Sequence, residues 1–287
     1  MRDPQAEKPV VVGWDGSPHA EDALELGRLL AGTTGGELVK AAVSVDHFAK
    51  LRGHRPTTQS PERSAVVVAA RAEPRPVVSS SAGDGLHDLA EELGAGVIVI
   101  GSTNRGPIGR VFFGTVADDL VHGAPCSVAI APDGYARRYA NRLLRLMVVG
   151  FDASPEARVT TEFAARLAVA ANAVLHVIAV HEPPAPVAAG AGYAIADVPP
   201  DEGRRLQREV DGVLATLPPD VRAEGQVVSG HAAHRLVEAS RGNVDLLVIG
   251  SRGHGPIGRT LLGSVSSEIV RSAPCPVLVV PRGADAA

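Results

Sequence analysis

The stretch GSRGHGPIGRTLLGSVSSEIV, residues 250–270, carries the strongest indication of fold in this sequence. It follows the apolar run VDLLVIG at 244–250, which is typical of a strand buried on both faces. After the glycines, residues 265–272 have the pattern of a helix. A strand, bare backbone and a helix N-terminus together predict a phosphate site, because the free N–H groups of a helix start attract anions.

The same arrangement occurs a second time, as GSTNRGPIGRVFFGTVADDLV at 101–121. The two glycine-rich blocks align without a gap, and roughly half of their positions are identical. A second pair of matching blocks, VVVGWDGSPHAEDAL at 10–24 and MVVGFDASPEARVTT at 147–161, opens each half. The sequence therefore predicts a tandem repeat of one domain. We place the domains at 1–135 and 145–287, with a polar, Arg-rich linker at 136–144.

Composition excludes several classes of protein. Of the 287 residues 45% are hydrophobic, 21% are charged and 3% are aromatic, as in a globular protein with an aliphatic core. The net charge of −4 argues against a nucleic-acid partner, and no apolar run is long enough to span a membrane. Cys126 and Cys275 occupy matching Ala-Pro-Cys triplets, which we interpret as small buried residues at strand starts. These features favour a cytoplasmic protein.

Strand and helix patterns alternate throughout each half. Ser17-Pro18 and Ser154-Pro155 are typical of an N-cap followed by proline in the first helical turn. We expect strands at 9–14, 37–45, 75–80, 96–101 and 127–132, and again at 146–151, 173–180, 221–229, 244–250 and 276–281. We expect helices at 17–31, 61–71, 84–93 and 116–122, and again at 154–171, 201–217, 233–241 and 265–272. The pattern predicts an α/β fold in which each half is a five-stranded parallel sheet of order 3-2-1-4-5 with helices on both faces. Pro76 would put the third strand of the first half at a sheet edge, and the Pro- and Ala-rich residues 181–200 are predicted to be mobile.

In such a sheet the ligand site lies at the carboxyl ends of the strands, where the strand order reverses between strands 1 and 4. The polar and glycine signals fall on those two strand ends. They are Gly13, Trp14 and Asp15 with Gly101 in the first half, and Gly150, Phe151 and Asp152 with Gly250 in the second. We therefore expect residues far apart in the sequence to meet at one crevice in each half.

Several side chains near this crevice have two interpretations. Arg252 and Arg259 either add positive charge for a phosphate or are solvated loop residues. Asp152 either contacts a ligand, through a metal or a nucleoside, or has a local role, in which it caps the following helix or makes an Asx turn. The loop lacks the Walker A pattern, and its glycines follow strand 4 rather than strand 1, so neither a P-loop nor a Rossmann fingerprint is present.

The spacing Gly250-x2-Gly253-x9-Gly263-Ser264 after strand 4, with Asp152 after strand 1 and a last strand APCPVLVV, resembles the universal stress protein family in its tandem, ATP-binding branch. The resemblance covers nearly the whole chain. It implies two tandem Rossmann-like (HUP-type) domains that bind ATP, in some members with Mg²⁺ or Mn²⁺. It also implies pairing through the last strands, here as a pseudo-dimer within one chain, with a homodimer as the alternative.

The resemblance assigns contacts residue by residue. In the second half Asp152 would contact adenosine or metal, Val177 would border the adenine, and the ribose and phosphates would lie on Gly250, Gly253, Gly263, Ser264 and Val265. In the first half the matching residues are Asp15, Ala41, Gly101, Gly114, Thr115 and Val116. One departure from the pattern is Asn104, which stands where the second glycine belongs. Asparagine tolerates a left-handed backbone, so either the loop keeps its shape and the first half also binds ATP, or the side chain crowds a phosphate.

These observations predict a nucleotide-dependent regulator of the stress response with an unnamed protein partner and no fast catalysis. A slow ATPase or adenylating enzyme of the same fold is one alternative, for which His231 and His234 are the available histidines. A partner-binding scaffold without nucleotide is the other.

Overall fold

A computed structural model describes residues 7–46, 73–102, 115–182, 187–189, 192–194, 202–251 and 262–281. The strands described in the first half are β1 (Val10–Gly13), β2 (Leu38–Val45), β3 (Arg75–Ser79), β4 (Val97–Gly101) and β5 (Ser127–Ala131). Those of the second half are β6 (Leu146–Phe151), β7 (Val174–His181), β10 (Arg222–Ser229), β11 (Leu246–Gly250) and β12 (Val277–Val280).

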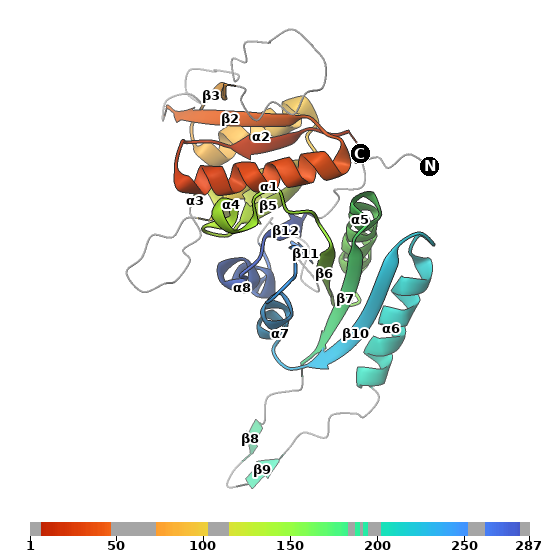
Figure 1. Cartoon of the computed structure of the whole chain (residues 1–287). Helices are drawn as coiled ribbons and strands as arrows, with labels where there is room; N and C mark the ends of the chain where they lie inside the picture. The colour runs from red at the N-terminus through yellow and green to blue at the C-terminus, as the bar shows by residue number, and fades with distance from the viewer. Residues whose placement is uncertain are drawn as a thin grey trace.

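These ten strands form one sheet of order β10-β7-β6-β11-β12-β5-β4-β1-β2-β3, and the two further described strands, β8 (Val187–Ala189) and β9 (Gly192–Ala194), pair only with each other. Within each half of the ten-stranded sheet all neighbours are parallel, and the order 3-2-1-4-5 predicted from the sequence is confirmed. The halves meet where β12 and β5 pair antiparallel, with Leu278 opposite Ala129. The last strands therefore join the two half-sheets within one chain (Figure 1). β3 lies at one outer edge, as its proline predicted.

Helices cover both faces of this sheet. The helices are α1 (Pro18–Thr34), α2 (Ala82–Leu93), α3 (Thr115–Gly123), α4 (Tyr135–Tyr139), α5 (Pro155–Ala171), α6 (Glu202–Thr216), α7 (Ala232–Ala239) and α8 (Ser264–Ser272). One buried apolar cluster lies under α1, α4, α5 and α6, and a second lies under α2, α3, α7 and α8. Each cluster continues from one half into the other, so the halves share their core.

Three helices begin at a serine cap. The side chains of Ser17, Ser81 and Ser154 accept hydrogen bonds from the backbone N–H groups of Ala20, Asp84 and Ala157. Pro18 and Pro155 then occupy the first turns of α1 and α5. These caps confirm the Ser-Pro prediction and fix where α1 and α5 leave the crevice edge of the sheet.

The segment between the halves, expected from the sequence to be a linker, begins with helix α4. Its backbone is hydrogen-bonded to a buried carboxylate of each half. The buried carboxylate of Asp22 in α1 accepts the N–H groups of Gly134 and Ala136, each at 2.8 Å. The carboxylate of Asp245, 4% exposed, accepts those of Arg145 and Leu146 at 2.8 and 3.0 Å. Two buried acids thus fix the path of the chain from β5 to β6.

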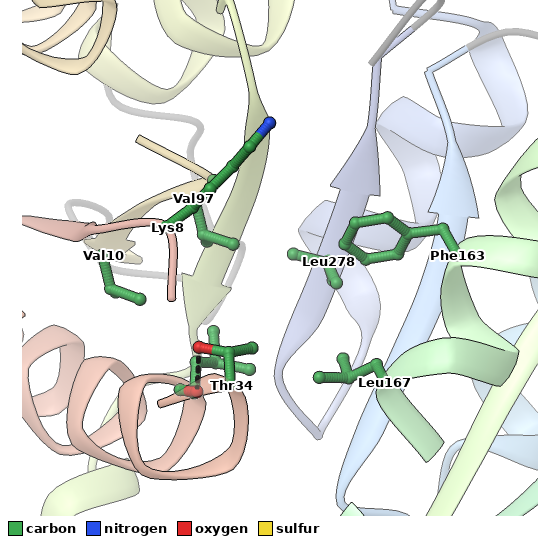
Figure 2. A pocket seen from close by; sticks show the side chains of 9 residues that line it. Lys8, Val10, Thr34, Val97, Phe163, Leu167 and Leu278 are labelled. Atoms are coloured by element: carbon green, nitrogen blue, oxygen red, sulfur yellow. Dashed lines mark hydrogen bonds between the residues drawn. The ribbon is translucent and has the colours of Figure 1, made fainter. Parts of the chain in front are cut away.

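A small cavity of about 20 Å³ marks the contact between the halves. Val10, Val97 and Thr34 approach it from the first half, and Phe163, Leu167 and Leu278 approach it from the second (Figure 2). The contact between α1 and α5 is therefore close but incompletely filled.

The segment 181–200, predicted to be mobile, contains a short antiparallel hairpin of β8 and β9 where it is described. The hairpin of β8 and β9 lies apart from the ten-stranded sheet (Figure 1). The helix predicted at 61–71 lies outside the described residues.

Candidate functional site

The second half contains a cavity of about 260 Å³ at the carboxyl ends of β6 and β11. This is the predicted switch point, since β6 and β11 are neighbours in the sheet and their crossover helices leave toward opposite faces. The lining includes seven of the predicted site residues: Gly150, Phe151, Asp152, Gly250, Gly263, Ser264 and Val265. Residues from both ends of the second half are therefore brought together at one site.

The start of α8 forms the polar side of this cavity. Its N-cap is Gly263, which has no side-chain oxygen to accept the free N–H groups of the first turn. Ser264 is exposed at the first helical position, and the buried Ser266 donates from Oγ to the carbonyl oxygen of Gly250 at 2.9 Å. This bond holds the helix start against the end of β11, with the positive end of α8 toward the cavity.

The start of α7, on the same cavity, is different. Its N-cap His231 makes no side-chain capping bond, and the carboxylate of Glu182 instead accepts the N–H of Ala232. Glu182 therefore offsets the positive end of α7, whereas the cap of α8 carries no negative group. An anion in the cavity is consequently favoured at α8 over α7.

The aspartates after strand 1 make Asx turns. Asp152 Oδ1 accepts the N–H of Ser154 at 3.0 Å, and Asp15 Oδ1 accepts that of Ser17 at 2.9 Å. Partial burial raises the pKa of Asp15, but the hydrogen bonds from Ser17 outweigh it and leave that pKa below its usual value. The Asx-turn interpretation therefore holds for both residues, whereas Ser17 and Ser154 are the helix caps, and Asp152 in addition lines the cavity.

One predicted contact, that of Val177 with the adenine, is wrong, because Val177 is not part of the apolar wall of the cavity. Val177 is fully buried on the face of the sheet covered by α5, and it does not line the cavity. Ile178 and Val180 line it instead. The strand register gives the reason, because Gly150 pairs with Ile178 as Gly13 pairs with Ala41. The residue that matches Ala41 is therefore Ile178, and a slip of one residue along a strand moves a side chain to the opposite face.

Two of the predicted glycines lie close to a neighbouring helix. A Cβ at Gly150 would lie 3.0 Å from Leu236 Cδ1, and a Cβ at Gly101 would lie 2.1 Å from the carbonyl oxygen of His19. The close approach of α1 therefore requires glycine at Gly101 whether or not a ligand binds, whereas a Cβ at Gly150 would need only a small shift of the Leu236 side chain.

The remaining predicted residues are placed as follows. Trp14 packs on the α1 face, with Lys40 Nζ 5.0 Å from its ring centre, and so points away from the face of Gly13. Thr115 begins α3, and Val116 packs against the core under α2 and α3. Asn104, Gly114, Arg252, Gly253 and Arg259 lie outside the described residues. His231 and His234 are exposed at the start of α7 and do not line the cavity.

Sequence reasoning missed eight residues that line the cavity: Ala157, Ile178, Val180, Ala232, Leu236, Ile249, Ser266 and Ile269. Four of them, Ile178, Val180, Ala232 and Leu236, come from β7 and α7, on which no motif falls. An alignment of the two halves by strand register would have indicated Ile178.

Both cysteines are buried just before the last strands, as predicted. Burial raises the pKa of Cys126 and that of Cys275 to about 12 each. These thiols stay protonated near neutral pH and behave as small apolar side chains.

The architecture defines the chain as a doubly wound α/β protein with a cavity at the switch point of its second half. A family model described as "Universal stress protein family" matches residues 7–132 and 144–281. The chain therefore belongs to the universal stress protein family, with two family domains in tandem.

Individual relatives agree with this assignment. Universal stress protein Rv2319c of Mycobacterium tuberculosis is 34% identical over 205 residues, which cover 69% of this chain and 68% of that protein. A universal stress protein of Mycolicibacterium smegmatis is 30% identical over 66% of this chain and 63% of its own. Among solved structures, a universal stress protein from Archaeoglobus fulgidus superimposes with a TM-score of 0.63 at 19% identity, covering 96% of this chain and 99% of its own. That likeness supports the fold alone.

Among the described helices, none is both long enough and apolar enough to cross a membrane.

Proposed function

We propose that the second half of this chain binds ATP, with the phosphates at the N-terminus of α8 and the nucleoside against the apolar wall of the cavity. The observation that carries the proposal is the cavity itself, in which a helix start without a side-chain cap faces an apolar wall. The choice of adenine comes from the family resemblance. Anion binding at α8 and apolar contact along Ile178 and Leu236 are the parts supported by geometry.

The orientation of the ligand follows from the two helix starts. Glu182 places a carboxylate at α7, which would repel a phosphate, while Gly263 leaves the positive end of α8 open. The phosphates would therefore lie at Ser264 and Val265. A Mg²⁺ or Mn²⁺ ion on the phosphates would offset their repulsion from Asp152, which also lines the cavity.

We infer a regulatory rather than a catalytic use of the nucleotide. The described residues that line the cavity include no histidine, cysteine or lysine, and the buried Ser266 hydroxyl donates to the Gly250 carbonyl oxygen rather than to a base. Nucleotide occupancy would instead alter the surface offered to a protein partner. Sustained phosphate or AMP release above roughly one per second would favour the enzyme alternative.

The first experiment identifies and counts the small molecules released when the purified chain is denatured. Two ATP per chain would extend the proposal to the first half, including its Asn104. One ATP per chain is the result expected if only the second half of the chain binds ATP. Absence of nucleotide, together with a flat ATP titration, would overturn the proposal and favour the scaffold.

A matched pair of substitutions at the α8 cap tests the phosphate position. The backbone of Gly263, with φ −61° and ψ 154°, suits an Asp or Asn cap, and both residues cap helices well. Gly263→Asp adds a negative charge where the phosphates would lie, so we expect ATP affinity to fall by about tenfold or more relative to Gly263→Asn. Calorimetric titration measures the affinities, and thermal unfolding checks that both variants fold. Equal affinities for the two variants would contradict a phosphate at this helix start.

A further inference from the structure

Three metal-ligating side chains meet in the first half of the chain, the half without the described cavity. They are His19, Asp22 and Asp133, each of which offers one ligand atom within 4.8 Å of the other two. His19 and Asp22 are three residues apart at the start of α1 and so lie on one face of the helix. Asp133 follows β5 at the entry to α4. The fold therefore brings together groups that are far apart in the sequence.

The carboxylate of Asp22 is held in a fixed orientation. It is 3% exposed, and its Oδ2 and Oδ1 accept the N–H groups of Gly134 and Ala136, each at 2.8 Å. Each carboxylate oxygen has a further lone pair after accepting one such bond. Carboxylates that bind metal ions are themselves usually oriented by hydrogen bonds, as Asp22 is here.

The ring nitrogen Nδ1 of His19 is buried and has no hydrogen-bond partner among the described residues. Asp133 Oδ1 lies 3.7 Å away, beyond hydrogen-bond distance. A buried polar atom without a partner costs free energy, and this one lies beside two carboxylates that repel each other. A cation between the three groups would satisfy the nitrogen and offset the repulsion.

We propose that His19, Asp22 and Asp133 bind a divalent transition-metal ion, with zinc as the probe. One imidazole nitrogen and two carboxylate oxygens favour Zn²⁺ over Mg²⁺ or Ca²⁺, which prefer oxygen ligands throughout. Three protein ligands leave coordination positions for water. The ion would tie the start of α1 to the turn that leads out of the first half.

The tandem repeat limits the site to one per chain. The second half has Glu156, Val159 and Arg282 at the matching positions of the sequence, and this set lacks an imidazole and includes a cation. The site does not depend on nucleotide binding, so it is tested without ATP.

The experiment titrates ZnCl₂ into the metal-free full-length chain by calorimetry. We expect one Zn²⁺ per chain, with affinity lowered about tenfold or more in His19→Ala and in Asp133→Asn. The control is His87→Ala, because His87 lies in an exposed pair with Glu91, 3.9 Å apart, and represents adventitious zinc binding by a surface histidine. This control should bind zinc like the parent chain.

Circular dichroism of the metal-free variants establishes that they fold, and zinc should raise the unfolding temperature of the parent and of His87→Ala but not of His19→Ala. Asp22 is left unchanged because it also caps α4. Absence of saturable binding, or unchanged binding by His19→Ala and Asp133→Asn, would overturn the proposal and leave the cluster as an ion pair that holds the turn.

Discussion

Asp245 and Gly96 occupy matching places before the fourth strand of each half, but only Asp245 has a side chain to contribute. Both backbones make the same bond, from Gly96 N–H to the Pro9 carbonyl and from Asp245 N–H to the Leu146 carbonyl. The carboxylate of Asp245 also accepts the N–H groups at the end of the junction and pairs with Arg142. At the scale of single residues, one buried acid therefore fixes where the second half begins.

We expect Asp245→Ala to lower the free energy of unfolding by roughly 2–3 kcal/mol, because it leaves the part-buried N–H groups of Arg145 and Leu146 without their acceptor. Asp245→Asn keeps one side-chain oxygen and should cost less. Urea unfolding measures both, with Asp220→Ala as an exposed control expected within about 0.5 kcal/mol of the parent. A loss for Asp245→Ala no larger than that of the control would show that the junction does not depend on this carboxylate.

At the scale of elements, the helices differ in how they begin. α1, α2 and α5 have serine caps, whereas α8, which starts at the cavity, has a glycine cap without a side-chain oxygen.

Ser154 is 1% exposed, so its removal leaves the N–H of Ala157 without a partner. We expect Ser154→Ala to cost about 1 kcal/mol in urea unfolding. Ser267→Ala, inside α8, should be neutral or slightly stabilising, since alanine favours a helix interior. Equal effects of the two changes would contradict the capping argument.

At the scale of the whole molecule, the two halves share a sheet and a core but leave the small cavity between α1 and α5 (Figure 2). Val97 lines this cavity, whereas Val99, two residues along the same strand, is buried without lining it. Val97→Ile should raise the free energy of unfolding by up to about 1 kcal/mol, because the added methylene fills space.

Val99→Ile adds the same group where there is no room, and overpacking should lower the free energy of unfolding by about 1–3 kcal/mol. Urea unfolding of the two variants measures the effect of the same added methylene group beside the cavity, at Val97, and in the filled core, at Val99. Effects of the same sign would show that the cavity does not limit the contact between the halves.

Much of the fold could be predicted from the sequence because its causes are local. Alternating strand and helix patterns, the Ser-Pro starts and the proline in β3 each act within a few residues, and the repeat showed that both halves share one topology. The switch point then followed from strand order, which located the edge that bears Asp152 and Gly250.

The faces of the buried strands were decided only by the tertiary structure. β7 is apolar on both sides, so its local pattern is the same for either face, and pairing with Gly150 selects Ile178 over Val177. Contacts between residues far apart in the sequence could not be predicted from it either. Examples are the contact of Glu182 with the start of α7 and that of His19 with Asp133. The sequence alone determined the repeat, the topology and the sheet edge that bears the cavity, because these depend on short-range pattern. Side-chain direction and long-range pairing depend on register and packing, which no local pattern contains.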